Sequence, residues 1–432
     1  MVVLVAGHGA PPFLIREVYA MCYQLSKASA VGALILSLFL ALPAWAVEDA
    51  TSKNAASRSV NSFALRAAAL LGEKPEDFFF SPFSVVPALG MTYAGARGET
   101  AREMEAALLF SSDIHASLGT LTRELTDALN GENGAPLLTS ANRVWLRDGL
   151  TLRPDFSVTL LSSYGSAAQE TDFKGDPEGS KKKINAWVEK QTHDRIRGLI
   201  QKIEPDTQMI LTNAVYFMGE WAEPFNEKNT EPTPFHLSST ETRDVSMMKK
   251  HKELAYGEAN EGRLKLLRLP YKGRLSLLLA LPSEDAGGME KTLELLSGEK
   301  GLETFEGWRK SLSPYEVDLW LPKFRVEKRY ELKDLLASLG MRLAFENAAD
   351  FSGMTDEERL KIDSVIHQTF IEVDEKKTEA AAATSVAIVR ATAVAPRQRP
   401  RAEFHADRPF LYFVMDDSTG TILFMGRQGF KE

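Results

Sequence analysis

The chain has 432 residues, of which 51 are basic and 59 are acidic, so its formal net charge is −8. This acidic balance gives no indication of a nucleic-acid-binding protein. A chain of this length can bury most of the surface that its unfolded form exposes. The only cysteine, Cys22, lies close to the N-terminus, so the rest of the chain must be held together by its core and not by disulfides.

The first 46 residues are typical of an export signal. An apolar run at residues 30–42 is followed by Ala44-Trp45-Ala46, a small-x-small cleavage site. The apolar run is too short for a membrane span. We therefore expect residues 1–46 to be removed, with Met21 as an alternative start, and residues 47–57 to be flexible. The mature protein would be secreted, in the extracellular or periplasmic space.

Apolar spacing predicts the elements of the first half of the chain. Helical periodicity occurs in residues 58–71, 154–164 and 181–200. Phe78-Phe79-Phe80 indicates a buried strand that Pro82 ends, and Ser81 or Ser84 would cap the next helix. We find no Pro/Gly/Ser-rich linker between residues 59 and 374, which favours one continuous domain.

The second half of the chain is predicted to be rich in strands. Residues 209–217 have the apolar density of a strand buried on both faces, yet Asn213 lies in the middle. A buried amide must find partners or cost about 1–3 kcal/mol. Other strands are expected at residues 264–269, 275–281, 315–324, 364–373, 410–415 and 421–425, with short strands in 233–256 and a helix at 289–296.

Motifs of catalysis are absent from the sequence. There is no H-E-x-x-H, no G-x-S-x-G, no phosphate-binding glycine loop and no Cys/His cluster. We therefore expect neither an enzyme nor a metal site, and no cofactor.

The stretch at residues 372–409 is the most unusual in the chain. It begins as a strand, passes through Ala380 to Ala383 and ends in a segment rich in Pro and Arg. Thr378 followed by Glu379 resembles a helix N-terminus, and alanine is the best helix former. An Ala-rich linker or short surface helix is therefore one interpretation.

The same stretch resembles the reactive-centre loop of the serpins. In that family an acidic hinge is followed by Thr-Glu-Ala-Ala and small residues, and the chain returns to strands through Pro-Phe, here Pro409-Phe410. Residues 182–192 and the segment Asn213 to Trp221 match the family pattern as well. The resemblance implies an exported, prokaryotic member with an α+β serpin fold of three β-sheets and about nine helices. The domain would span residues 58–432, with an exposed reactive-centre loop at about 375–408.

The resemblance also implies roles for individual residues. The loop hinge would comprise Glu375, Lys377, Thr378, Glu379, Ala380, Ala381, Ala382 and Ala383. The shutter and breach, where the main sheet opens, would contain Ser81, Ser84, Asn213, Trp221, Lys323 and His367. A hydrogen bond between Asn213 and His367 would latch the sheet, and Lys323 would form a salt bridge with Glu375.

The function implied is suicide inhibition of a serine protease. The enzyme would cut the loop, and the loop would insert into the main sheet and trap a covalent 1:1 complex with a monomeric inhibitor. Counting forward from Glu375 places the reactive bond at Ala391-Thr392, with Arg390-Ala391 as the alternative, whereas counting back from Pro409 lands near Gln398. We favour the forward count because about seven extra residues before the cut would leave roughly 23 Å of slack.

The implied partner is an elastase-like or subtilisin-like protease, with a trypsin-like enzyme as second choice. Nucleic acid and membrane are not expected partners. Lys377 stands where inhibitory members usually have glycine, so a non-inhibitory serpin that acts as a binding or carrier protein is the alternative.

Overall fold

The computed structural model describes residues 44–129, 137–283, 287–376 and 399–431. The chain divides into two compact units, Met1–Thr51 and Ser52–Glu432, and the fold below is that of the second. Residues 47–57, expected to form a flexible segment before the domain, lie in helix α3 (Ala44–Gly72). Of the expected export signal, residues 1–43 lie outside the described part of the chain.

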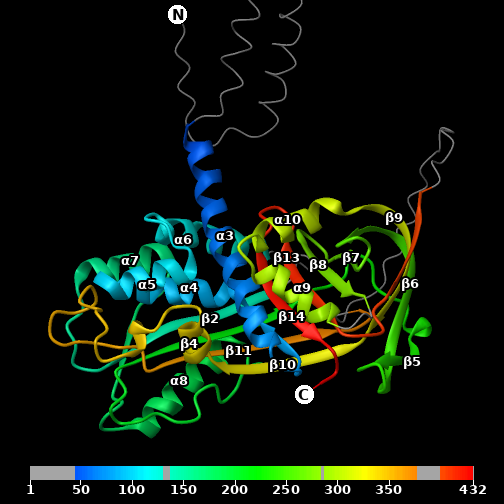
Figure 1. The fold of residues 1–432 in the computed structure, drawn as a ribbon. Coiled ribbons are helices and arrows are strands. Elements are labelled where there is room, and N and C mark those ends of the chain that lie inside the picture. The colour runs from blue at the N-terminus through cyan, green and yellow to red at the C-terminus, as the bar shows by residue number, and fades with distance from the viewer. Residues whose placement is uncertain (1–43, 130–136, 284–286, 377–398, 432) are drawn as a thin grey trace, which may run out of the picture. The chain divides into compact units, whose positions relative to one another are not determined.

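One sheet has five strands in the order β10-β11-β4-β2-β3 (Figure 1). These strands are β2 (Leu137–Arg147), β3 (Gln169–Thr171), β4 (Met209–Met218), β10 (Phe324–Glu331) and β11 (Ser364–Val373). The two central strands, β4 and β11, run parallel, and each pairs antiparallel with its outer neighbour, β2 or β10. Parallel strands need a long connection, and the chain between β4 and β11 forms most of the other sheet.

The other strands form a nine-stranded sheet in the order β1-β14-β13-β8-β7-β6-β9-β12, with β5 paired to β6. They are β1 (Phe78–Phe80), β5 (Glu231–His236), β6 (Thr242–Ala259), β7 (Leu264–Pro270), β8 (Leu275–Pro282), β9 (Ser313–Pro322), β12 (Arg401–His405), β13 (Phe410–Asp416) and β14 (Ile422–Gln428). The long strand β6 pairs with β9 over most of its length and with β7 near its end. Two of the three expected sheets are therefore joined by hydrogen bonds through β6.

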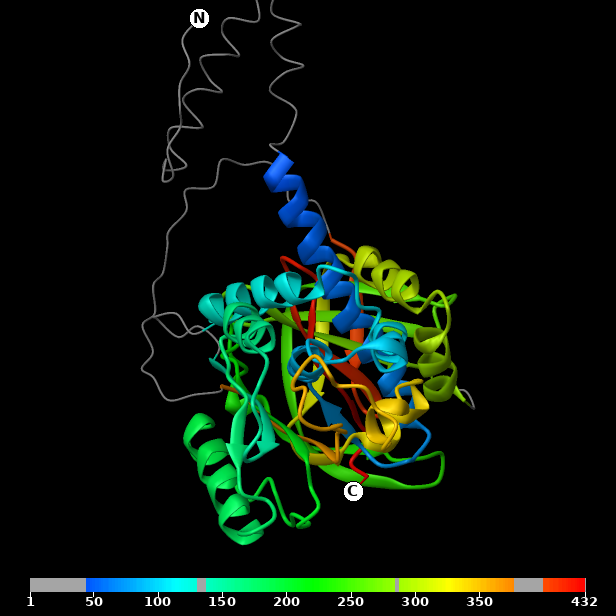
Figure 2. The same ribbon diagram turned by 90° about the vertical axis from the view of Figure 1, so that its left-hand side faces the viewer.

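Nine α-helices occur in the described residues, in agreement with the expected number. Besides α3 they are α4 (Pro82–Tyr93), α5 (Gly98–Leu108), α6 (Ile114–Leu129), α7 (Pro154–Tyr164), α8 (Pro177–Gln191), α9 (Gly288–Ser297), α10 (Gly301–Ser311) and α11 (Lys333–Ser338). Helix α4 lies between the two sheets and contacts β2, β4 and β14, whereas α8 packs on the opposite face of the five-stranded sheet (Figures 1 and 2).

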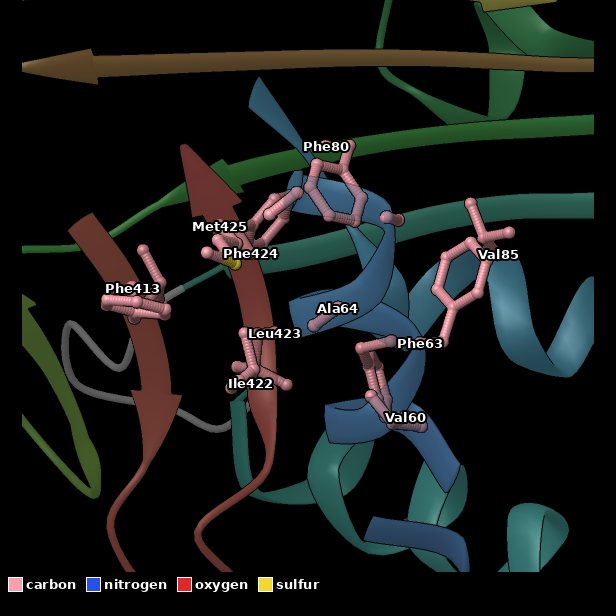
Figure 3. Close-up of a cluster of buried hydrophobic side chains, with 14 of the residues drawn as sticks. Val60, Phe63, Ala64, Phe80, Val85, Phe413, Ile422, Leu423, Phe424 and Met425 are labelled. Atoms are coloured by element: carbon pink, nitrogen blue, oxygen red, sulfur yellow. The ribbon is translucent and has the colours of Figure 1, made fainter. Parts of the chain in front are cut away.

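The largest core cluster extends through most of the second unit, and α3, α4 and the β13–β14 hairpin supply part of it. Side chains of α3, including Val60 and Phe63, pack beside Phe80 and the strand residues Leu423 and Phe424 (Figure 3). A second cluster lies under α8, where Ile184 and Val188 contact the outer face of the five-stranded sheet. Because neighbouring residues of a strand point to opposite faces, both faces of β4 are buried, as its apolar density predicted.

Several boundaries differ from those expected. The helical face predicted over residues 181–200 ends with α8 at Gln191, although residues 196–200 still supply buried side chains. The predicted elements did not include α10 and α11. The reactive-centre loop was expected to reach residue 408, but β12 begins at Arg401 and pairs in parallel with β9.

Candidate functional site

Polar residues form a row across the centre of the five-stranded sheet. Asn142 on β2 lies opposite Asn213 on β4, which lies opposite His367 on β11. Tyr330 on β10 completes the row opposite His367, and its ring stacks on the imidazole with 6.4 Å between centroids. The row therefore spans four of the five strands, with the β4–β11 junction at its middle.

Hydrogen bonds fix the tautomer of His367. The backbone N–H of Ser81 donates to Nε2 of His367 over 3.0 Å, so this nitrogen must carry the lone pair. The proton of the neutral ring is then on Nδ1, which donates to Oδ1 of Asn213. The hydrogen bond expected between Asn213 and His367 is thus present and has a defined direction.

The start of helix α4 docks against this row. Ser81 caps the helix by accepting the Ser84 N–H, and its hydroxyl donates to the Leu423 carbonyl of β14 over 2.7 Å. The amide of Asn213 donates to Oγ of Ser84 over 2.7 Å and to Oδ1 of Asn142 over 2.6 Å. One network therefore ties α4 to β2, β4, β11 and β14.

Burial dominates the electrostatics of His367. Its side chain has no exposed surface, and burial lowers its pKa to about 3, although the contact with Asn213 acts in the opposite direction. The imidazole is consequently neutral near pH 7, as its role as acceptor from Ser81 requires. This geometry suits a structural latch, because both ring nitrogens are already engaged.

A second group of contacts lies at the end of β11 where the loop begins. The indole N–H of Trp221 donates to the carbonyl of Asp374 over 2.8 Å, and the indole stacks on Tyr271 with centroids 4.4 Å apart. The backbone carbonyl of Glu375 accepts the N–H of Phe225 over 2.8 Å. Residues 374 and 375 are thus hydrogen-bonded to the segment that carries Trp221 and Phe225.

The carboxylate of Glu375 is bound on both oxygens. The ammonium of Lys323 lies 2.6 Å from Oε2, and the hydroxyl of Thr230 donates to Oε1 over 2.8 Å. Burial alone would raise the pKa of Glu375, but these donors outweigh it and hold the pKa below its ordinary value. The expected salt bridge between Lys323 and Glu375 is therefore present, with Glu375 only 7 % exposed.

The predicted residues fall into these two groups. Ser81, Ser84, Asn213 and His367 come together at the centre of the sheet, and Trp221, Lys323 and Glu375 at the hinge end. The remaining hinge residues and the bonds Arg390-Ala391 and Ala391-Thr392 lie outside the described residues.

Sequence reasoning did not single out Asn142, Tyr330, Thr230, Phe225 or Tyr271, of which Asn142 and Thr230 hydrogen-bond to predicted side chains. Asn142 could have been found as an amide inside a strand pattern, the feature that pointed to Asn213. Thr230 gives no such signal, since it follows a short 3-10 turn at Glu227–Asn229.

Comparison with known proteins identifies the family. A model of the family "Serpin (serine protease inhibitor)" matches residues 58–428. An uncharacterized serpin-like protein of Thermococcus kodakarensis is 40% identical over 372 residues, covering 85% of this chain and 84% of that protein. The leukocyte elastase inhibitor of Bos taurus is 36% identical, covering 81% and 92%. The structure of human thyroxine-binding globulin with thyroxine superposes with a TM-score of 0.73 at 28% identity, covering 87% and 98%.

The fold, the family model and these relatives show that this chain belongs to the serpin family. The family is one of serine protease inhibitors, and the fold is the α+β serpin fold. Among the described residues we find no cluster of side chains suited to a metal ion, and no helix long and apolar enough to cross a membrane.

Proposed function

We propose that the protein is a secreted suicide inhibitor of serine proteases that traps the acyl-enzyme by inserting its cleaved loop between β4 and β11. The observation that carries this proposal is the place of the hinge. Glu375 lies two residues after the end of β11, one of the two parallel central strands, and is clamped at the end of the junction that would have to open.

The sheet topology favours insertion of a strand at this position. A segment that folds back after Glu375 would run antiparallel to β11 and also antiparallel to β4. Insertion would replace one parallel ladder of seven residue pairs by two antiparallel ladders. Antiparallel pairing is slightly more stable per residue, and the inserted strand would gain ladder hydrogen bonds that an exposed loop lacks.

The small hinge residues suit this movement. Thr378, Ala380 and Ala382 would face one side of the sheet, because side chains alternate along a strand. Small side chains can enter a close-packed sheet with little steric cost. Bulky or charged side chains at these positions would have to be buried at high cost.

We place the reactive bond at Ala391-Thr392, with Arg390-Ala391 as the alternative. The partner would be an elastase-like or subtilisin-like protease, or a trypsin-like enzyme for the alternative bond, in a covalent 1:1 complex. The name of the bovine relative, leukocyte elastase inhibitor, supports the first choice. Nine residues would then separate the bond from β12 at Arg401, on the side that is released after cleavage. The inhibitor would not act as an enzyme, since each molecule is consumed.

A non-inhibitory carrier is the second candidate. Two observations favour it: Lys377 replaces the usual glycine beside the hinge threonine, and the fold superposes on thyroxine-binding globulin, which was solved with thyroxine. A long charged side chain at the pivot would hinder entry of the loop if insertion buried it.

Incubation with a panel of elastase-like, subtilisin-like and trypsin-like proteases tests the proposal. We expect a complex that survives denaturing electrophoresis, and mass spectrometry of the released C-terminal peptide to show that it starts at Thr392. A start at Ala391 would select the alternative bond, and a start at Gln398 or later would refute the tether argument. Cleavage without any stable complex would favour the carrier.

A further inference from the structure

An aromatic pair closes the β4–β11 junction at its hinge end. The registered pairing of the two strands ends with Phe370 opposite Tyr216. Beyond it, β4 stays paired with β2 as far as Met218 and β11 with β10 as far as Val373. The central strands therefore separate from each other while each keeps its outer neighbour, and Tyr216 and Phe370 form the last closed rung.

The two rings touch across the junction. Their centroids are 5.7 Å apart with an interplanar angle of 30°, and Tyr216 and Phe370 are 2 % and 7 % exposed. They lie on the face covered by α8, because Ala214 and Ile366 on the same sides of these strands belong to the core cluster under that helix. The stack is thus a buried contact between the two strands that insertion would separate.

Two arginines flank the rings from neighbouring segments. The guanidinium carbon of Arg325, on β10, lies 4.8 Å from the centroid of Phe370. That of Arg195, four residues after α8, lies 5.5 Å from the centroid of Tyr216. Both distances are within the range of cation–π attraction. We call the four residues Arg195, Tyr216, Phe370 and Arg325 the aromatic clasp.

The geometry points to the Tyr216–Phe370 stack of the aromatic clasp as the gate that sets how fast a strand enters the sheet. Neighbouring strands are about 4.8 Å apart, so strands on either side of an inserted one are roughly 9.6 Å apart. The ring contact cannot survive that separation. A strand that folds back from Glu375 would meet this rung first, and the contact between the Tyr216 and Phe370 rings therefore stabilises only the uninserted state. The contact of Arg325 with Phe370 lies within the β10–β11 pair, which insertion leaves intact. This inference rests on the proposed function, because it names the barrier to the same insertion.

Uptake of a synthetic peptide tests the gate without knowledge of the target protease. The peptide has the sequence of residues 378–391 and carries a fluorescent label, and its incorporation into the full-length protein is followed by native electrophoresis. We expect Arg325→Met, which removes only a contact within the β10–β11 pair, to leave the rate of uptake nearly unchanged. Phe370→Leu removes the stack across the junction and should speed uptake roughly tenfold. Arg243→Met is the matched control, since it removes an arginine 5.9 Å from the Phe430 ring, away from the junction, and should leave the rate unchanged.

A second measurement separates a gate from an ordinary core contact. In the peptide-bound form the stack is already broken, so Phe370→Leu should lower the thermal midpoint of the free protein and leave that of the peptide-bound form nearly unchanged. Equal losses in both forms, or a wild-type uptake rate in Phe370→Leu, would overturn the gate and leave the proposed function standing. A wild-type protein that takes up no peptide, and whose sheet therefore does not open, would overturn both.

Discussion

His367 should make the latch of the central sheet sensitive to acid. Burial lowers its pKa to about 3, against 6.5 for an ordinary histidine. Between these values the unfolded chain binds a proton that the folded protein does not, so stability falls as the pH is lowered through this window. At about 1.4 kcal/mol per pH unit, this one side chain should cost about 2 kcal/mol at pH 5 relative to pH 7.

A second buried group acts in the opposite direction. Burial raises the pKa of Asp77 to about 6 from 3.8, although the N–H groups of Gly429 and Lys431 counteract it. The folded protein then binds the extra proton between these values, so the contribution of Asp77 to stability falls as the pH rises through this window. The pH dependence of the whole protein is therefore not a test of His367 alone.

The contribution of His367 can be isolated by comparison with His367→Gln. Unfolding by denaturant at pH 7.5 and pH 5 should show wild type losing about 2 kcal/mol more than the variant. Ring resonances of labelled histidine provide a direct check, since the peak that disappears in the variant should not shift between pH 7.5 and pH 5 in the folded wild type. A peak that titrates with a midpoint near 6.5, or equal losses in both proteins, would refute the reasoning.

Other predictions concern the hinge. Lys323→Met leaves the carboxylate of Glu375 with only the hydroxyl of Thr230 as a side-chain donor. It should lower the free energy of unfolding of the uncleaved protein by about 1–3 kcal/mol, as measured by denaturant titration. An unchanged midpoint would mean that the salt bridge does not clamp the hinge. Thr378→Arg would place a charge in the sheet, and Ala382→Pro would remove a ladder N–H. Both variants should be cleaved as substrates without forming stable complexes, as judged by denaturing electrophoresis, and persistent complexes would show that the hinge is assigned wrongly.

The central contacts of the site could be predicted from the sequence because each involves a residue that stands out on its own. Asn213 is an amide in an apolar strand, and His367 and Lys323 occupy positions implied by the family resemblance. Asn142 was missed because its role depends on the register of β2 against β4. Such a register joins segments far apart in the chain, and local periodicity does not specify it.

Element boundaries were likewise predicted well where local sequence marks them and poorly where they depend on contacts between distant segments. The helix at residues 154–164 and the strand at 364–373 were predicted to the residue, since proline or a dense apolar run marks them. The end of the loop was placed too late because β12 has only five residues, and its pairing with β9 is a tertiary contact. The joining of two sheets through β6 likewise depends on which partners that strand meets along its length.

The most direct test of the account is the thermal midpoint before and after a nick between Val386 and Pro396. Insertion would add on the order of 10 ladder hydrogen bonds at about 1 kcal/mol each. For a domain of this size we expect the midpoint to rise by at least about 10 °C. A midpoint that stays the same or falls after cleavage would contradict loop insertion and favour a non-inhibitory serpin.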